Sequence, residues 1–301
     1  MRIVSPHGRV LEVGDGKTRL MGVLNVTPDS FSDGGRYADP ARAIDHARRL
    51  LDEGADLVDV GGESTRPGAG TVDEVAELAR VLPVVEALAR DGALVSVDTT
   101  KPRVMREAIA AGASMVNDVR ALREPGGIEA VAASGVAVCL MHMQGTPGTM
   151  QARPVYGDVV TEIREFLAAR ARACEAAGIA SDRIVVDPGF GFGKTLAHNL
   201  ALLAGLAAIA ETGYPVLAGL SRKSMLAAIV GRDDPDRLPT SVAAAIAAVA
   251  HGAAIVRVHD VRATVDALAV WRAVGAAGGG FEQPADGTAG SGAGVRMRER
   301  R

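Results

Sequence analysis

Two stretches of the sequence decide the fold, and they read Asp187-Pro188-Gly189-Phe190-Gly191-Phe192-Gly193-Lys194 and Met21-Gly22-Val23-Leu24-Asn25-Val26-Thr27-Pro28-Asp29-Ser30-Phe31-Ser32-Asp33-Gly34-Gly35. An apolar run typical of a strand precedes the first stretch and opens the second, and each run gives way abruptly to polar residues, Gly and Pro. The same change follows the apolar runs that end at Val60, Val97, Val116, Leu220 and Val258. Polar groups gathered at strand ends are typical of a β/α barrel enzyme.

Short β-branched runs alternate along the chain with longer segments rich in Ala, Leu, Glu and Arg. We predict strands near residues 19–26, 56–61, 94–98, 115–119, 136–142, 184–187, 215–220 and 254–259. We predict helices near residues 40–53, 73–90, 102–112, 126–134, 158–178, 197–211, 239–252 and 262–274. Eight alternating units with continuously apolar strands predict a parallel α/β sheet closed into a (β/α)8 TIM barrel. A doubly wound open sheet is the alternative, but it concentrates chemistry at one or two switch points.

The two ends of the chain differ from this pattern, and we divide the chain into residues 1–17, 18–275 and 276–301. In the first segment Val4, Val10, Leu11 and Val13 predict a short hairpin that closes the barrel floor. The middle segment is the expected catalytic barrel. The last segment is rich in Gly, Ala, Ser and Thr and ends in arginines, so we expect a disordered, solvated tail, although the arginines could bind an anionic partner.

Composition excludes several classes of function. The 301 residues carry a net charge of −3, which favours neither nucleic acid nor an anionic membrane as partner. Only two cysteines, Cys139 and Cys174, are present and lie far apart, so a disulfide framework or a structural zinc site is not expected. The start lacks the apolar core of a signal peptide, and the longest apolar runs fall short of the roughly 20 residues of a membrane helix. We therefore expect a cytoplasmic enzyme.

The strand-end motifs, taken in order from about residue 19 to residue 265, closely resemble those of the dihydropteroate synthases, a pterin-binding barrel family. An ordered set of eight motifs is far more specific than any single motif. The resemblance implies a transferase of folate biosynthesis that joins p-aminobenzoate to (7,8-dihydropterin-6-yl)methyl diphosphate and releases 7,8-dihydropteroate and diphosphate. It also implies Mg²⁺ as cofactor, inhibition by sulfonamides and a homodimer.

Three polar residues suit the recognition of a pterin, which is flat and has amide-like donors and acceptors along one edge. Asp98, Asn117 and Asp187 end the third, fourth and sixth predicted strands. A carboxylate accepts two N–H groups of such an edge, and a carboxamide both donates and accepts. The resemblance assigns these three residues and Lys223 to the pterin. The alternative is that each Asp or Asn caps a helix or shapes a turn.

Cationic residues at the seventh and eighth strand ends suit the leaving diphosphate, since many barrels bind phosphate there. Arg257 and His259 are two positions apart and so share one face of their strand. The resemblance implies that Asn25, Thr65, Arg257 and His259 bind the diphosphate and that Asn25 ligates Mg²⁺. The alternatives are a surface ion pair for Arg257, a structural role for His259 and a helix start at Lys223.

The polar loops at residues 25–35 and 63–70 follow the first two barrel strands, and long loops there are usually functional. The resemblance places Thr65, Arg66, Pro67 and Ser224 at the p-aminobenzoate. It further implies that Asp98, Lys223, Arg257 and His259 act in catalysis. We infer that Asp98 stabilises positive charge on the pterin and that Mg²⁺, Arg257, His259 and Asn25 stabilise the departing diphosphate. The alternative for the loop glycines is a turn without further function.

Other motifs are set aside. A phosphate-binding P-loop ending at Lys194 would need glycine where Pro188 stands, and glycines at every second position do not form a dinucleotide-binding fingerprint. His142 has no second metal ligand at a suitable spacing, and Met143 suits apolar packing. Two rival functions remain, namely a pterin-dependent methyltransferase and a pterin-binding paralogue without activity. The Ser-Thr-Arg-Pro and Ser-Arg-Lys-Ser motifs argue against the methyltransferase.

Overall fold

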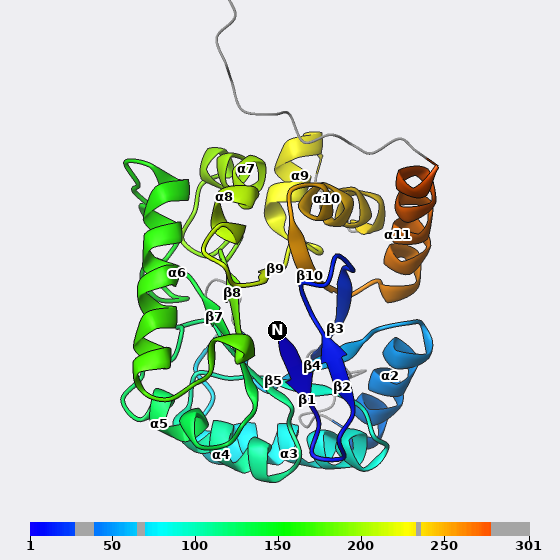
Figure 1. Cartoon of the computed structure of the whole chain (residues 1–301), viewed down its shortest axis with the longest axis vertical. Helices are drawn as coiled ribbons and strands as arrows, with labels where there is room; N and C mark the ends of the chain where they lie inside the picture. The colour runs from blue at the N-terminus through cyan, green and yellow to red at the C-terminus, as the bar shows by residue number, and fades with distance from the viewer. Residues whose placement is uncertain (28–38, 65–69, 233–235, 278–301) are drawn as a thin grey trace, which may run out of the picture.

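The computed structural model describes residues 1–27, 39–64, 70–232 and 236–277, and it confirms the closed parallel barrel (Figure 1). The strands follow one another around the barrel in chain order, with β10 closing on β3. Each lies within about three residues of its predicted position. The strands are β3 (Arg19–Asn25), β4 (Leu57–Gly61), β5 (Val95–Asp98), β6 (Met115–Asp118), β7 (Ala137–Met141), β8 (Ile184–Asp187), β9 (Val216–Ala218) and β10 (Ala253–Val258).

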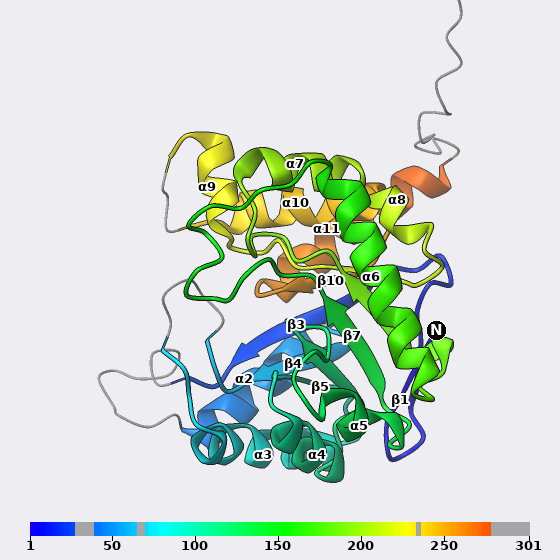
Figure 2. The same cartoon turned by 90° about the vertical axis from the view of Figure 1, so that its left-hand side faces the viewer.

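Helices surround the barrel on its outer face, as Figures 1 and 2 show. They are α2 (Pro40–Asp52), α3 (Glu74–Arg90), α4 (Pro102–Ala110), α5 (Gly127–Ala132), α6 (Val159–Ala176), α7 (Leu196–Ala204), α8 (Leu206–Ala210), α9 (Ser224–Val230), α10 (Leu238–Ala250) and α11 (Val261–Ala276), with a 3-10 turn η1 (Ser181–Arg183) before β8. Among the residues that the structure describes, no helix is both long and apolar enough to cross a bilayer.

Two helical predictions are wrong. The single helix expected at residues 197–211 is divided at Gly205, which packs so closely on α6 that a Cβ there would lie 2.8 Å from Val160 Cγ2. Helix α9 was missing from the predicted helices, because its seven residues are too few to show a clear helical period, although a helix start at Lys223 was considered as an alternative.

The predicted hairpin closes one end of the barrel. Strands β1 (Arg2–Val4) and β2 (Val10–Glu12) pair antiparallel, at the end opposite to that toward which β3 points (Figure 2). Ile3, Leu11 and Val13 face the barrel and pack on its apolar floor, which consists of Met21, Leu57, Leu94, Met115, Ala137, Cys139, Val185, Leu217 and Ile255. Val4 and Val10 pair in this hairpin as expected, and they are 40% exposed because alternate strand residues face opposite sides.

This floor positions the polar residues that end the strands. Side chains two positions further along a strand lie on the same face, so they stand directly above the floor inside the barrel. Asp59 lies two positions after the floor residue Leu57. Asn117, Asp187, Gly219 and Arg257 likewise lie two positions after the floor residues of their own strands. The alternate residues, such as Val58, pack outward between strands and helices. The boundaries at residues 17 and 275 stay predictions, and the predicted tail lies almost wholly outside the described residues.

Candidate active site

Neighbouring strands present a row of polar groups at the mouth of the barrel. The strand register aligns Asn25 with Gly61, Gly61 with Asp98, and Asp98 with Asn117. Gly61 leaves space in this row, since a Cβ there would lie 3.8 Å from both Asn25 Oδ1 and Asp98 Oδ2. The carboxamide of Asn25 and the carboxylate of Asp98 therefore converge above Gly61.

Arg257 extends this row from β10, the strand that pairs with β3 to close the barrel. Its Nε donates to Asp59 Oδ2 at 2.6 Å, and its second guanidinium nitrogen donates to Asp98 Oδ2 at 3.1 Å. Asn117 Nδ2 donates to the same oxygen of Asp59 at 3.0 Å. The interpretation of Arg257 as a surface ion pair is therefore wrong. Asp59 has no exposed surface and supports both Asn117 and Arg257 from below.

The carboxylates outnumber the cation in this network. Burial raises the pKa of Asp98 to about 8, and the nearby Asp59 adds to the rise while Arg257 opposes it. Burial also raises the pKa of Asp187, against the effect of Lys223. Burial opposes the charge on Arg257, but Asp59 and Asp98 outweigh it and raise its pKa. N–H donors from a ligand would stabilise ionised carboxylates here, so the site favours a ligand edge rich in donors.

Asp187 and Lys223 meet the loop that follows β8. Asp187 Oδ1 accepts a hydrogen bond from the Gly189 amide at 2.7 Å, so this carboxylate does shape a turn, as the alternative interpretation held. Lys223 Nζ donates to the carbonyl of Phe190 and lies 4.8 Å from the centre of the Phe192 ring. Burial lowers the pKa of Lys223 to about 8, although Asp187 opposes the shift.

Lys223 also lies beside Arg257, above Gly219. A Cβ on Gly219 would lie 3.8 Å from Arg257 Cβ and 4.0 Å from Lys223 Nζ. The backbone of Lys223 is at the N-cap of α9, so it opens a helix while its ammonium reaches back to the barrel mouth. Two cationic side chains predicted for catalysis are thereby brought together.

His259 is held by Ser221 from the neighbouring strand end. The Ser221 hydroxyl lies 3.0 Å from His259 Nδ1 and accepts a hydrogen bond from the His259 amide at 3.2 Å. Between Ser221 and Lys223, Arg222 adopts a left-handed backbone with φ of 58°, which is strained for a non-glycine residue. Its Nε donates to Asp260 Oδ2 at 3.1 Å.

The predicted p-aminobenzoate residues are only partly placed. Thr65, Arg66 and Pro67 lie outside the described residues. Ser224 is exposed at the first position of α9, next to Lys223.

The chain that leads to residue 65 is firmly anchored. Lys101 forms ion pairs with Glu63 and with the buried Glu77 of α3. Arg80 donates to the Gly62 carbonyl at 2.7 Å, and a Cβ on Gly62 would lie 2.9 Å from a methyl of α3. The backbone after β4 is therefore held against α3 and α4 up to Glu63.

Sequence reasoning left several of these groups without a role. Ser221 belongs to the Ser-Arg-Lys-Ser motif, and its position directly after a strand was the available signal. Lys101 had no signal, because its partners lie on other elements. Lys194 was considered only as part of a false P-loop, yet it is buried.

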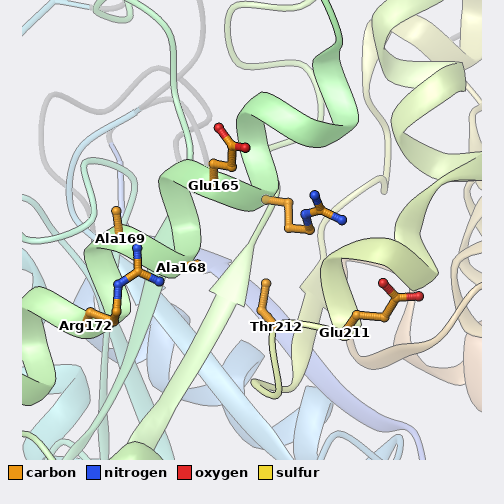
Figure 3. Close-up of a pocket in the computed structure, with 7 residues that line it drawn as sticks. Glu165, Ala168, Ala169, Arg172, Glu211 and Thr212 are labelled. Atoms are coloured by element: carbon orange, nitrogen blue, oxygen red, sulfur yellow. The ribbon is translucent and has the colours of Figure 1, made fainter.

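A hollow of about 650 Å³ lies away from these residues, on the outside of the barrel between α6 and the end of α8 (Figure 3). Charged side chains of both signs line it, namely Arg164, Glu165, Arg172 and Glu211. None of the strand-end residues borders it, so we place the chemistry at the barrel mouth.

Comparisons with known proteins show the family to which the chain belongs. Residues 21–259 match the family model described as pterin binding enzyme. A dihydropteroate synthase of Escherichia coli is 51% identical over 252 residues, which cover 83% of this chain and 89% of that protein. The Xanthomonas albilineans dihydropteroate synthase with 4-aminobenzoic acid is 54% identical, has a TM-score of 0.83 and aligns over 90% of this chain and 97% of that one. The Yersinia pestis enzyme in a sulfonamide drug complex is 48% identical, has a TM-score of 0.86 and aligns over 92% of this chain and 100% of that one. The chain belongs to the dihydropteroate synthases, within the family of pterin-binding enzymes.

Proposed function

We propose that this enzyme condenses p-aminobenzoate with (7,8-dihydropterin-6-yl)methyl diphosphate to give 7,8-dihydropteroate and diphosphate. The observation that carries this proposal is the convergence of buried acids, a carboxamide and two cations at one barrel mouth. Asp98 and Asn117 are register neighbours, and Arg257 contacts Asp98 and lies beside Lys223. Such a site offers acceptors to a flat donor-rich ring and positive charge to its leaving group.

The pterin would bind with its polar edge against the acids. Asp98 and Asp187 would accept its N–H groups, Asn117 would both donate and accept, and Lys223 would donate to a ring acceptor. The carboxylates are buried, so unpaired charge there is unfavourable and a ligand that donates hydrogen bonds is favoured. An apolar cluster beside β7 would cover a ring face, and it consists of Val119, Met141, Met143, Met150 and Phe192.

The diphosphate would bind at Arg257, His259, Asn25 and Thr65. The residues around Asn25 fit Mg²⁺, because the Asn25 oxygen and the Asp98 carboxylate both lie beside Gly61, which has no side chain to separate them. Mg²⁺ usually takes one or two protein oxygens and completes its shell with phosphate oxygens and water. When bound, the ion would neutralise charge that develops on the diphosphate.

The reaction is a displacement at the pterin methylene carbon. The bond from this carbon to the diphosphate oxygen breaks, and the electron pair leaves with the diphosphate. The amine nitrogen of p-aminobenzoate then forms the new bond and releases a proton to solvent. Asp98 stabilises positive charge on the pterin electrostatically, and Arg257, His259 and Asn25 stabilise the departing anion. An arylamine is neutral at pH 7, so the scheme requires no general base.

The p-aminobenzoate would lie at Thr65, Arg66, Pro67 and Ser224. The relatives named above support this substrate, since one was solved with 4-aminobenzoic acid and another with a sulfonamide drug. We infer that sulfonamides inhibit this enzyme by occupying the same place. By the same resemblance we propose a homodimer in the cytoplasm, and light scattering of the purified protein would test the dimer.

Product analysis tests the proposed reaction. The enzyme would be incubated with Mg²⁺ and both substrates, with each substrate omitted in turn, and dihydropteroate and diphosphate would be quantified. We expect equal amounts of both products only when both substrates are present. If the protein bound the pterin but formed no dihydropteroate, it would be the inactive paralogue.

A further inference from the structure

Lys194 is a buried cation that the proposed reaction does not use. Only 3% of its surface is exposed. Its ammonium lies 2.8 Å from the Gly189 carbonyl, 3.0 Å from the Phe192 carbonyl and 3.1 Å from His142 Nδ1. An ammonium has three donors, so these contacts use all of them.

The loop around this ammonium turns at three glycines. Gly189, Gly191 and Gly193 all have positive φ, at 69°, 79° and 65°. Buried backbone carbonyls outside helices and strands need other hydrogen-bond partners. Lys194 satisfies two of these carbonyls from the centre of the loop.

The same loop forms one wall of the proposed pterin pocket. Its Gly189 amide donates to Asp187, its Phe190 carbonyl accepts from Lys223, and its Phe192 ring lies under the Lys223 ammonium. A shift of the loop would therefore move the acceptor and the donor that we assign to the pterin.

We propose that Lys194 is a positioning residue for the pterin pocket, and that it acts by fixing the loop from Gly189 to Phe192 against Asp187 and Lys223. This inference rests on the assignment of Asp187 and Lys223 to the pterin. Lys194 itself touches no substrate, because its three donors are already used within the protein.

The pairing with His142 keeps this anchor intact over a wide pH range. Burial lowers the pKa of His142 to about 3, so its ring is neutral and one nitrogen can accept. Burial lowers the pKa of Lys194 to about 7, and Lys223 adds to the shift while Asp187 opposes it. A neutral amine would keep two donors for the two carbonyls and could accept from the other His142 tautomer. Either state of Lys194 can therefore hold the loop.

Replacement of Lys194 by methionine tests the proposal, since Lys194→Met keeps the length of the side chain and removes its donors. We expect the KM for the pterin diphosphate to rise at least tenfold, while the KM for p-aminobenzoate at saturating pterin stays within twofold. Binding of fluorescent 6-hydroxymethylpterin should weaken in parallel. If Lys194→Met does not fold, Lys194→Gln, which keeps one amide donor group, is measured by the same criteria.

Two controls make the result specific. Lys17→Met removes an exposed ammonium that precedes β3, at the other end of the barrel, and we expect its pterin affinity within twofold of the unmodified enzyme. Asp187→Ala tests the pocket assignment itself. If Asp187→Ala weakens pterin binding and Lys194→Met does not, the inference about Lys194 is wrong and the proposed function stands. If Asp187→Ala also leaves pterin binding unchanged, the assignment of Asp187 to the pterin pocket is wrong, and the inference about Lys194 loses its basis. If Lys194→Met raised the KM values for both substrates by the same factor, Lys194 would have a general structural role and the proposal would be wrong.

Discussion

At the scale of single residues, the proton affinity of Asp98 is set by its surroundings. The carboxylate is buried near a second acid, and both factors favour its neutral form, whereas Arg257 favours its charged form. The result is a pKa of about 8 in place of the ordinary value of 3.8. Between these values the folded enzyme holds a proton that the unfolded chain has lost.

This difference predicts how stability depends on pH. Since the folded state binds the extra proton, the contribution of Asp98 to the free energy of unfolding falls as pH rises from about 4 to about 8. The slope from one such group is at most about 1.4 kcal/mol per pH unit. Asp98→Asn should lack this slope. Urea unfolding of the unmodified enzyme and of Asp98→Asn at several pH values between 5 and 8 measures this slope. If the free energies of unfolding of the two proteins changed in parallel with pH, Asp98 would be ionised throughout this range.

The sequence could predict the roles of some site residues but not of others. Asp98, Asn117 and Asp187 each end an apolar run, which is a local signal. Asp59 received no role from the sequence because its partners, Asn117 and Arg257, lie 58 and 198 positions away. Only the closed barrel brings these side chains together, so no local pattern could assign Asp59 its role.

At the scale of elements, the loop after β8 shows what glycines at every second position are for. The sequence excluded a P-loop and a dinucleotide fingerprint, but it could not give the left-handed backbone of Gly189, Gly191 and Gly193. A Cβ on Gly189 would lie 2.0 Å from the His142 carbonyl, and one on Gly193 would lie 2.6 Å from the Gln144 carbonyl. These glycines allow the loop to pack directly on the end of β7.

A pair of alanine substitutions separates this packing from backbone strain. Gly178 also has positive φ, but a Cβ there would meet nothing within 4 Å, so Gly178→Ala should cost only about 1–2 kcal/mol of strain. Gly189→Ala adds a clash with backbone, and we expect a loss of more than ~3 kcal/mol or no folded protein. Urea denaturation gives both free energies. Equal losses in the two variants would contradict the close packing of the loop.

At the scale of the whole molecule, the architecture could be predicted because the barrel repeats one unit, and each unit has its own apolar period and polar end. The hairpin that closes the floor was predicted, but the prediction did not say which of its side chains face the barrel. Hydrophobicity alone does not say which face of a two-stranded hairpin meets the barrel. The alternation around Ile3 decides that face.

Substitutions in the hairpin test its role as the floor. Ile3 has no exposed surface, so Ile3→Ala should lower the free energy of unfolding by about 2–5 kcal/mol. The neighbouring Val4→Ala serves as the matched control and should change it by less than about 0.5 kcal/mol. The site lies at the other end of the barrel, so the KM values of folded Ile3→Ala should stay unchanged. Similar unfolding energies for the two variants would contradict the assigned faces.

The central claim is that barrel closure assembles one pterin site from residues on separate strands. Calorimetric titration of the pterin diphosphate with Mg²⁺ into the enzyme and into Asn117→Ala and Asp187→Ala tests it most directly. Asp182→Ala, which removes an exposed carboxylate before the start of β8, is the control. The account predicts that each site variant binds about 1–3 kcal/mol more weakly, with the control unchanged and all variants folded. Unchanged affinity in both site variants would contradict it.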